Sequence, residues 1–320
     1  RRRLMRAAPH LVRVLPFMIP VLSRDGLFPK KVAKALGSAL WMYDLTGGWR
    51  IGKLHRRLDA RRARAHLPSM PAERLAGGYL YYDASADDAR LTLTVARTAA
   101  DHGAVVVTRC PVVGVVDAPD GTGDPARVAG VVVEPAPAER LEIRAEVVVN
   151  ATGVWADQLA QLEDPDRPTS IRPAKGVHIT VPWELVRNDI AVIVPVRADK
   201  RSLFLVPWGE RGDGTFRHCY VGTTDTDHDG SLDEPQCDAD DLDYVLRALN
   251  EAIAPGPDDR RITADDVTGV WAGLRPLLTS SSGTKTADLS RNHRVSVGRR
   301  GIVDIAGGKL TTGRLMAEHT

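Results

Sequence analysis

The stretch that decides the fold is VVVNATGVW at residues 147–155. A run of valines that ends in a turn is typical of a buried strand in a parallel sheet. The small residues Ala151 and Gly153 follow at once, and the residues after Trp155 have the composition of a helix. A strand that passes through small residues into a helix leaves room for a flat ring against the backbone. A plain strand-to-helix turn is the simpler alternative.

The residues before this stretch predict alternating helix and strand. Residues 87–101 predict a helix, which His102 and Gly103 close. Apolar runs predict four strands, at residues 104–107, 112–116, 128–134 and 141–150. The turn-rich segment 119–123 predicts a hairpin connection between the second and the third of them. A helix, a parallel-type strand, a β-meander and a second buried strand form the second half of a doubly wound nucleotide domain.

A second motif is IAGGKLTT at residues 305–312. A strand is expected to run into two glycines and then into a helix whose first turn has unpaired N–H groups. Such a helix start carries a partial positive charge and suits an anionic group. Lys309 would point to the place where an oxyanion could sit. An ordinary glycine-containing turn is the simpler alternative.

Between the two motifs, and before them, the pattern differs. Residues 171–285 mix short strands, at 178–181 and 203–206, with an acidic helix at about 238–253, which indicates an inserted α+β domain. Residues 1–66 read as helical, because Leu4, Ala8, Leu11 and Leu15 recur at close to helical spacing. The chain returns to the first domain with a strand at 301–306.

The 320 residues are 43% hydrophobic and 26% charged, which is typical of a soluble globular protein. Three scattered cysteines indicate neither a zinc site nor a disulfide framework. Residues 1–66 carry sixteen Lys or Arg against three Asp, so this end is expected to meet an anionic membrane or nucleic acid. A solvated arginine-rich face is the alternative. No apolar run reaches the length of a membrane span. Both ends of the sequence have the pattern of a truncated chain, so an internal fragment is expected.

Further motifs accompany these two in the same order along the chain: KGVH at 175–178, GTTD at 222–225 and GLRPL at 273–277. Together they resemble the FAD-dependent glycerol-3-phosphate dehydrogenases, which belong to the wider family of flavin amine and amino-acid oxidases. The segments AAPH at 7–10, Tyr43-Asp44 and DDARL at 87–91 fit the same family. The resemblance covers almost all of the chain.

The resemblance implies an α/β fold: an FAD-binding doubly wound domain, like that of glutathione reductase and the amino-acid oxidases, with an inserted α+β substrate cap domain. The expected division is a basic helical segment at 1–73, part of the FAD-binding domain at 74–170, the cap domain at 171–285 and a return to the FAD-binding domain at 286–320. The family's N-terminal G-x-G-x-x-G and its C-terminal helical domain are absent from this sequence, and Gly313 stands where a bulkier residue is expected.

The implied reaction is oxidation of sn-glycerol 3-phosphate to dihydroxyacetone phosphate, with hydride transfer to FAD and electrons passed to a quinone. An imidazole suits a general base, and an arginine fork matches phosphate oxygens. The implied catalytic residues are His178, Arg275 and Lys309, and the implied substrate-binding residues are Arg275, Arg291 and Lys309. The implied FAD-binding residues are Val112, Ala151, Thr152, Gly153, Trp155, Gly307, Gly308, Leu310, Thr311 and Thr312.

For several of these side chains, a purely structural role is the alternative. Arg275 could close a strand and pair with an acidic neighbour, Arg291 could lie in an exposed polar turn, and His178 could be a satisfied core residue. Asp225 and Asp227 are expected to cap a loop, because nothing in the reaction needs a metal.

Three other functions stay open: a glycerol-3-phosphate oxidase that uses oxygen, an inactive fragment, and a basic nucleic-acid-binding module. The last would need aromatic residues between the arginines of residues 56–64, and none is there, so no nucleic-acid partner is expected. The expected partners are glycerol 3-phosphate, a quinone, an anionic membrane surface and a second copy of the chain in a homodimer. The expected location is the cytoplasm, at the inner face of the plasma membrane.

Overall fold

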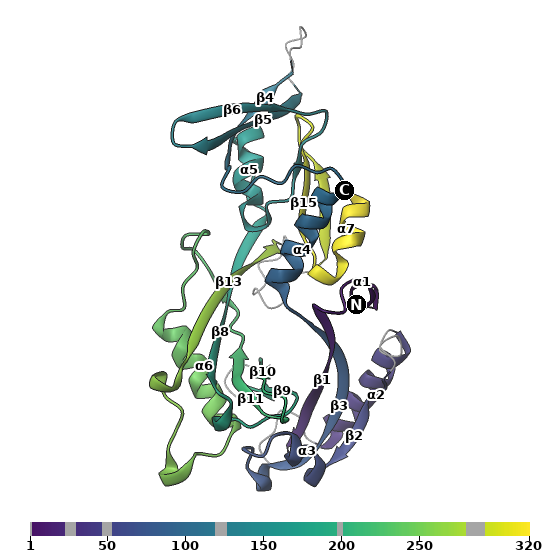
Figure 1. Ribbon diagram of the computed structural model, residues 1–320, viewed down its shortest axis with the longest axis vertical. Helices are drawn as coiled ribbons and strands as arrows, with labels where there is room; N and C mark the ends of the chain where they lie inside the picture. Colours follow the sequence, from purple (N-terminus) through teal and green to yellow (C-terminus); the bar gives the residue numbers. More distant parts are fainter. Residues whose placement is uncertain (1, 23–29, 47–52, 119–126, 197–200, 280–291) are drawn as a thin grey trace. The chain divides into compact units, whose positions relative to one another are not determined.

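A computed structural model describes residues 2–22, 30–46, 53–118, 127–196, 201–279 and 292–320. The chain folds into two compact units, each assembled from separated stretches (Figure 1). Unit 1 consists of Arg1–Val95, Gly176–Thr224 and Gln236–Ala272, and unit 2 of Ala96–Lys175, Asp225–Pro235 and Gly273–Thr320. The four-part division expected from the sequence stays a prediction about the functional domains.

Unit 1 is built on one large sheet whose strands alternate between buried and half-buried residues. The strands lie in the order β8 (Ile171–Pro182), β11 (Phe216–Gly222), β10 (Ser202–Glu210), β9 (Ala191–Pro195), β1 (Val12–Leu22), β3 (Leu75–Ala86) and β2 (Arg56–Asp59). Strand β13 (Gly269–Leu278) also pairs with β8. Along the order from β8 to β2, neighbouring strands are antiparallel except β1 and β9.

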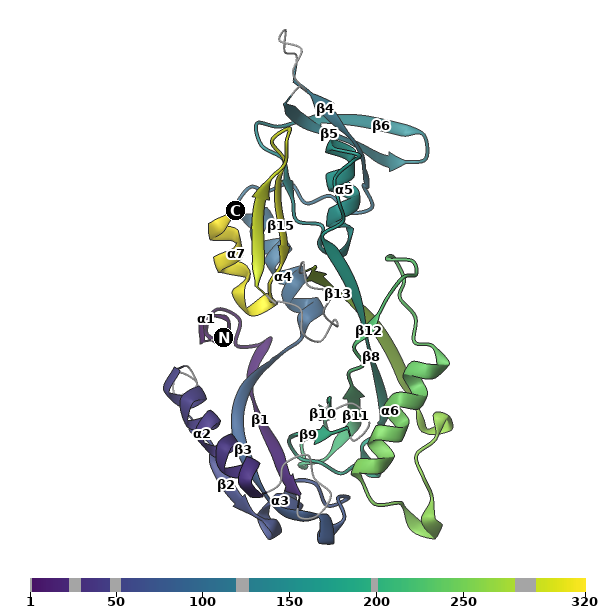
Figure 2. The same ribbon diagram turned by 180° about the vertical axis from the view of Figure 1, so that it is seen from behind.

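One face of this sheet carries the main core of the protein. Leu203 and Leu205 of β10 and Cys219 of β11 are fully buried there. Two helices cover this face, α3 (Ala60–His66) through Ala63 and α6 (Ala239–Ala252) through Leu249 (Figure 2). Helix α6 matches the expected acidic helix, and a capping box between Asp238 and Asp241 begins it.

The expectation that residues 1–66 are helical is wrong for Val12–Leu22 and for Arg56–Asp59, which form strands β1 and β2. Helix α1 ends at Ala7, and β1 then pairs with β3 along its whole length and with β9 at Phe17 and Met18. Burial explains the difference, because the strand places Met18 in the core with no exposed surface. Helical structure is present on either side, in α1 (Arg2–Ala7), α2 (Lys30–Thr46) and α3.

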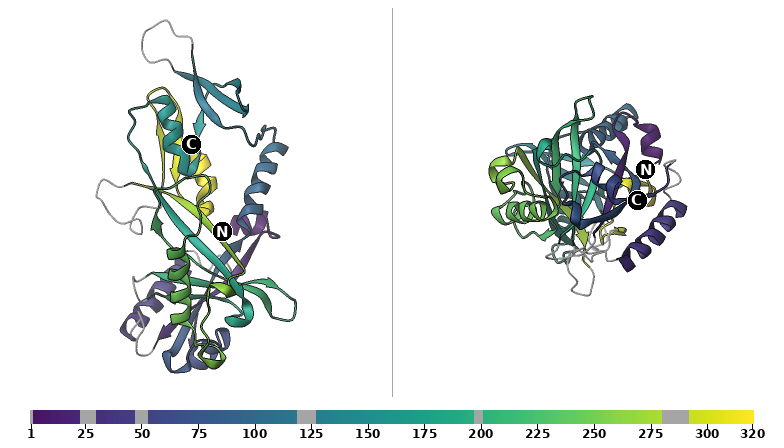
Figure 3. Two further views of the ribbon diagram at one scale, coloured as in Figure 1. Left: turned by 90° about the vertical axis from the view of Figure 1, so that its left-hand side faces the viewer. Right: turned by 90° about the horizontal axis from the view of Figure 1, so that it is seen from below.

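Unit 2 contains two small sheets with helices beside them. One sheet has the order β14 (His293–Val297), β15 (Val303–Gly307) and β7 (Val149–Asn150), and the other is the expected meander of β4 (Val112–Asp117), β5 (Val128–Ala136) and β6 (Glu139–Arg144). Helix α5 (Ala156–Glu163) follows β7, and α7 (Gly313–His319) follows β15. Strand β15 and helix α7 are yellow in Figure 3. Strand β12 (Thr226–Asp227) pairs with the first part of β8.

Helix α4 (Asp88–Asp101) agrees with the expected helix, but two strand expectations in this region are wrong. Residues 104–107 form no strand, and Val105 is 89% exposed. A strand needs a hydrogen-bonded neighbour, and the described residues provide none there. The single strand expected at 141–150 is two strands, β6 and β7, because the chain leaves the meander at Ala145. The hairpin connection at 119–123 lies outside the described residues.

Within the described part of the chain, no helix is both long and apolar enough to cross a membrane.

Candidate functional site

The two sequence motifs meet in the parallel pair formed by β7 and β15. Val303 pairs with Val149, and Asp304 pairs with Asn150. Because the strands are parallel, the loop after Asn150 and the loop after Ala306 leave the same edge of the sheet. The two strands are thus a parallel pair within a mixed sheet, whose third strand, β14, is antiparallel to β15. Ligands of such sheets bind beyond the carboxyl ends of the strands.

Glycines with a left-handed backbone form both loops. The φ angles are +64° at Gly153, +75° at Gly307 and +78° at Gly308, a region that side chains disfavour. A Cβ at Gly307 would lie 2.7 Å from the Asn292 carbonyl oxygen, so a side chain there would also clash. At Gly153 nothing lies within 4 Å of such an atom, so the backbone is bare on that side. A bare backbone at the carboxyl edge fits a flat ring laid against it.

Asn150 fixes the turn that carries the first loop. Its side chain has no exposed surface. The Nδ2 amide donates to Asp304 Oδ1 and to the Ala156 carbonyl oxygen, each at 2.8 Å. Its Oδ1 accepts from Thr152, at 2.7 Å from the hydroxyl and 3.3 Å from the backbone N–H. The Asn150 side chain therefore joins Asp304 of strand β15, Thr152 in the turn and Ala156 at the start of helix α5.

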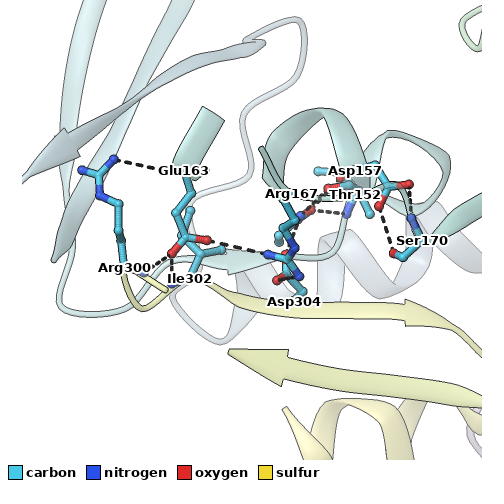
Figure 4. A network of polar contacts seen from close by, with 10 residues as sticks. Thr152, Asp157, Glu163, Arg167, Ser170, Arg300, Ile302 and Asp304 are labelled. Atoms are coloured by element: carbon cyan, nitrogen blue, oxygen red, sulfur yellow. Dashed lines mark hydrogen bonds and ion pairs between the residues drawn. The ribbon is translucent and has the colours of Figure 1, made fainter. Parts of the chain in front are cut away.

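Behind this edge lies a buried network of ions (Figure 4). Arg167 Nη2 lies 2.7 Å from Asp304 Oδ2, and Arg167 Nη1 lies 3.7 Å from Glu163 Oε2. Glu163 Oε1 accepts from the backbone N–H of Arg300 at 2.6 Å and that of Ile302 at 3.4 Å. The network ties α5 to β15. Removing one partner of such a network leaves a buried charge unpaired, which is strongly destabilising.

The other expected FAD-binding residues fall at different places in unit 2. Trp155 is 39% exposed, and its indole N–H donates to Asp233 at 3.1 Å. Residues Leu310–Thr312 form a 3-10 turn, so the helix expected directly after the glycines begins only at Gly313. Val112 opens β4 in the other sheet, opposite Val133.

Arg275 is held by an acidic partner. Its Nη1 lies 3.3 Å from Asp225 Oδ1, and the two side chains are 33% and 14% exposed. Asp225 therefore contacts Arg275, where a loop-capping role was expected, and Asp227 pairs with Arg172. Lys309 is exposed at the start of the 3-10 turn. Arg291 lies outside the described residues.

His178 lies on β8 within unit 1. Its ring stacks on the indole of Trp271, with centroids 5.1 Å apart and planes at 10°. Arg275 and Lys309 belong to unit 2, so the convergence of these three side chains stays a prediction. A cavity of about 660 Å³ in unit 1 is lined by residues such as Arg64, Met70 and Ile262, and contains none of the expected site residues.

Sequence reasoning misses Trp271, Tyr220 and the partner of Arg275. Trp271 precedes Arg275 by four residues in VWAGLRPL. That alternating run indicates a strand, but it does not show which strand lies beside it. Asp225 stands out in the GTTD motif, yet its pairing with a residue 50 positions away leaves no local signal.

Comparison with known proteins shows which proteins the chain is similar to. Residues 2–320 match the family described as FAD dependent oxidoreductase. "Glycerol-3-phosphate dehydrogenase 2" of Mycobacterium tuberculosis is 40% identical over 311 residues, which are 97% of this chain and 49% of that protein. The human mitochondrial glycerol-3-phosphate dehydrogenase is 32% identical, with 100% of this chain and 42% of that protein covered. The chain spans about half the length of these relatives.

Solved structures show the same likeness. A glycerol-3-phosphate dehydrogenase from Bacillus halodurans, complexed with FAD, superposes with a TM-score of 0.75 at 28% identity, over 99% of this chain and 52% of that one. L-α-glycerophosphate oxidase from Mycoplasma pneumoniae, with FAD bound, gives a TM-score of 0.64 at 14% identity, over 99% of this chain and 76% of that one. The second likeness concerns the fold alone.

Proposed function

We propose that this chain, which belongs to the FAD dependent oxidoreductase family, is part of an enzyme that oxidises sn-glycerol 3-phosphate to dihydroxyacetone phosphate. The observation that carries the proposal is the parallel pairing of β7 and β15, which brings the loops of Gly153 and Gly307 to one sheet edge. The relatives that are 40% and 32% identical to the chain bear the name glycerol-3-phosphate dehydrogenase.

Each site residue has one task in this reaction. The left-handed glycines at 153, 307 and 308 shape the two loops, and the backbone at Gly153 is bare. FAD, when bound there, would supply the acceptor for the hydride that leaves C2. His178 takes the proton of the C2 hydroxyl as the carbonyl forms. Arg275, oriented by Asp225, binds the phosphate, because the guanidinium fork matches its oxygens. Lys309 adds a second positive charge, and Arg291 a third.

The proposed electron acceptor is a quinone, reached from the inner face of the plasma membrane. Helix α2 supports this, because it exposes Trp41, Met42 and Leu45 by 56%, 67% and 73%. Large apolar side chains in a basic segment suit an interfacial helix on anionic lipid. Of the other large apolar residues in this segment, Met18 is fully buried and Phe17 stacks on Tyr81. Phe28 lies outside the described residues.

The proposal is tested with the full-length protein under anaerobic conditions. Adding sn-glycerol 3-phosphate should bleach the flavin absorbance, whereas glycerol, glycine and proline should not. Reoxidation is then followed with a soluble quinone in one sample and with oxygen in another. Faster reoxidation by the quinone supports a dehydrogenase, and faster reoxidation by oxygen an oxidase. Bleaching by an amino acid, with none by glycerol 3-phosphate, would overturn the proposed substrate.

A further inference from the structure

The His178 imidazole lies within a small aromatic group on one face of the unit 1 sheet. Strand β8 lies between β11 and β13, and both neighbours contribute a ring. Trp271 of β13 stacks on the imidazole at 5.1 Å and 10°. Tyr220 of β11 meets both rings edge-on, at 6.1 Å from His178 and 5.9 Å from Trp271. Offset-stacked and edge-to-face arrangements at these distances are the favoured ones for aromatic pairs.

The opposite neighbour of His178 leaves the ring little freedom. Gly222 of β11 is its cross-strand partner in the antiparallel register. A Cβ at Gly222 would lie 2.3 Å from His178 Cδ2, closer than any side chain can come. The imidazole of His178 therefore lies over Gly222, a position that only glycine can occupy. The indole of Trp271, on β13, covers the imidazole.

The indole of Trp271 contributes little to the core. It is 46% exposed, and its ring contacts are with His178 and Tyr220. Tyr220 stays neutral beside the imidazole, because burial raises the pKa of its hydroxyl to about 12. A half-exposed tryptophan stacked on a single imidazole, with a neutral tyrosine at the edge, points to a role in fixing the ring.

We propose that Trp271 is a positioning residue for His178. This rests on the proposed function, in which His178 takes the proton of the C2 hydroxyl. The stack fixes the plane of the imidazole and thereby the direction in which its ring nitrogens point. Misplacing a reacting group by about 1 Å costs on the order of 100-fold in rate. The indole face also stabilises the imidazolium that forms when the proton arrives, since a cation over an indole is attracted to its π electrons.

The kinetic test compares W271L and W271F in the full-length flavoenzyme. Leucine removes the ring, and kcat for glycerol 3-phosphate should fall on the order of 10- to 100-fold while KM changes little. Phenylalanine restores a stacking face and should recover most of the loss. The matched control is W208L, because Trp208 is also exposed, at 45%. Its ring centroid lies 5.9 Å from that of Tyr220. This control should keep kcat within about twofold of the parent.

A second measurement reports the stack without turnover. In protein labelled at the histidine rings, the indole ring current shifts the His178 resonances, and W271L should move them while W208L leaves them in place. Resonances unchanged in W271L, or a moved resonance with unchanged kcat, would each overturn the positioning role. If H178N instead retains full kcat while the parent protein shows the ring-current shift, the stack exists and the proposed base is wrong. The two failures are thereby distinguished.

Discussion

Asn150 and Asp304, at paired positions of the parallel strands β7 and β15, share a hydrogen bond of 2.8 Å from Asn150 Nδ2 to Asp304 Oδ1. Asn150 thus links the sheet edge to the turn at Thr152, and Asp304 links it to Arg167. The loop that follows Asn150, which we propose holds FAD, is joined to the ion network through this one contact. The geometry of the loop therefore depends on buried polar groups.

Substituting Asn150 by alanine should destabilise the protein. The change leaves Asp304 Oδ1 and the Ala156 carbonyl without their donor, and an unsatisfied buried group costs about 1–3 kcal/mol. Urea unfolding followed by circular dichroism should give a lower unfolding free energy, and the purified protein should carry less FAD. Thr94→Ala, at a partly exposed position of α4, is the control and should change neither quantity. Equal stability of N150A and T94A would contradict this role.

Replacing Gly153 by alanine should weaken FAD retention. A left-handed backbone with a Cβ costs roughly 1–2 kcal/mol, and the new methyl would project from the bare backbone at the sheet edge. Gly313 is the matched control, because it is helical with φ −52° and has nothing within 4 Å of the position that a methyl group would take. FAD content and affinity, measured by flavin fluorescence, should fall in G153A and stay unchanged in G313A. Equal FAD affinity in both variants would refute the contact.

Substituting Arg275 by alanine should lower kcat/KM for glycerol 3-phosphate. If the guanidinium pairs with a buried phosphate, the loss is about 2–4 kcal/mol. The control is Arg211→Ala, because Arg211 is also ion-paired, with Glu184 at 2.8 Å, and is similarly exposed at 39%. Steady-state kinetics should show normal kcat/KM for R211A. A change of only a few-fold in R275A would remove Arg275 from the substrate site.

Removing the exposed apolar side chains Met42 and Leu45 of α2 should weaken the proposed binding to anionic vesicles. The double variant M42S/L45S deletes two exposed side chains, and the loss should be on the order of 10- to 100-fold. Leu93→Ser is the control, because Leu93 is 60% exposed on α4. Vesicle sedimentation is measured at one ionic strength, with duplex DNA as competitor. Tight DNA binding without vesicle association would instead favour the nucleic-acid alternative.

The sequence predicts best the features that local residues decide. The strand-to-helix turn at residues 147–155 and helix α6 follow from short patterns and a capping box. Strand β1 escapes such reasoning, because its partners are Tyr81 and Ala191, far away in the sequence. The prediction of a strand at residues 104–107 is wrong for the opposite reason. These residues have the composition of a strand, but no strand among the described residues pairs with them.

The site follows the same division. The glycine loops are visible in the motifs, because a backbone of that shape needs glycine. The stack of Trp271 on His178 and the pairing of Arg275 with Asp225 depend on which strands and loops become neighbours. Those neighbours are decided by the register of β8, which no single segment encodes.

The parallel pairing of β1 with β9 has a consequence for how the chain is made. Phe17 and its partner Ala191 are separated by roughly 170 residues. At synthesis rates of about 5–20 residues per second, a ribosome needs roughly 9–35 s between the two. During that interval the nascent β1 lacks one of its neighbours, and Met18 has no completed core to enter. Strand β1 therefore gains its second neighbour only after β9 has been translated, and until then it is open to non-native pairing or to capture by chaperones.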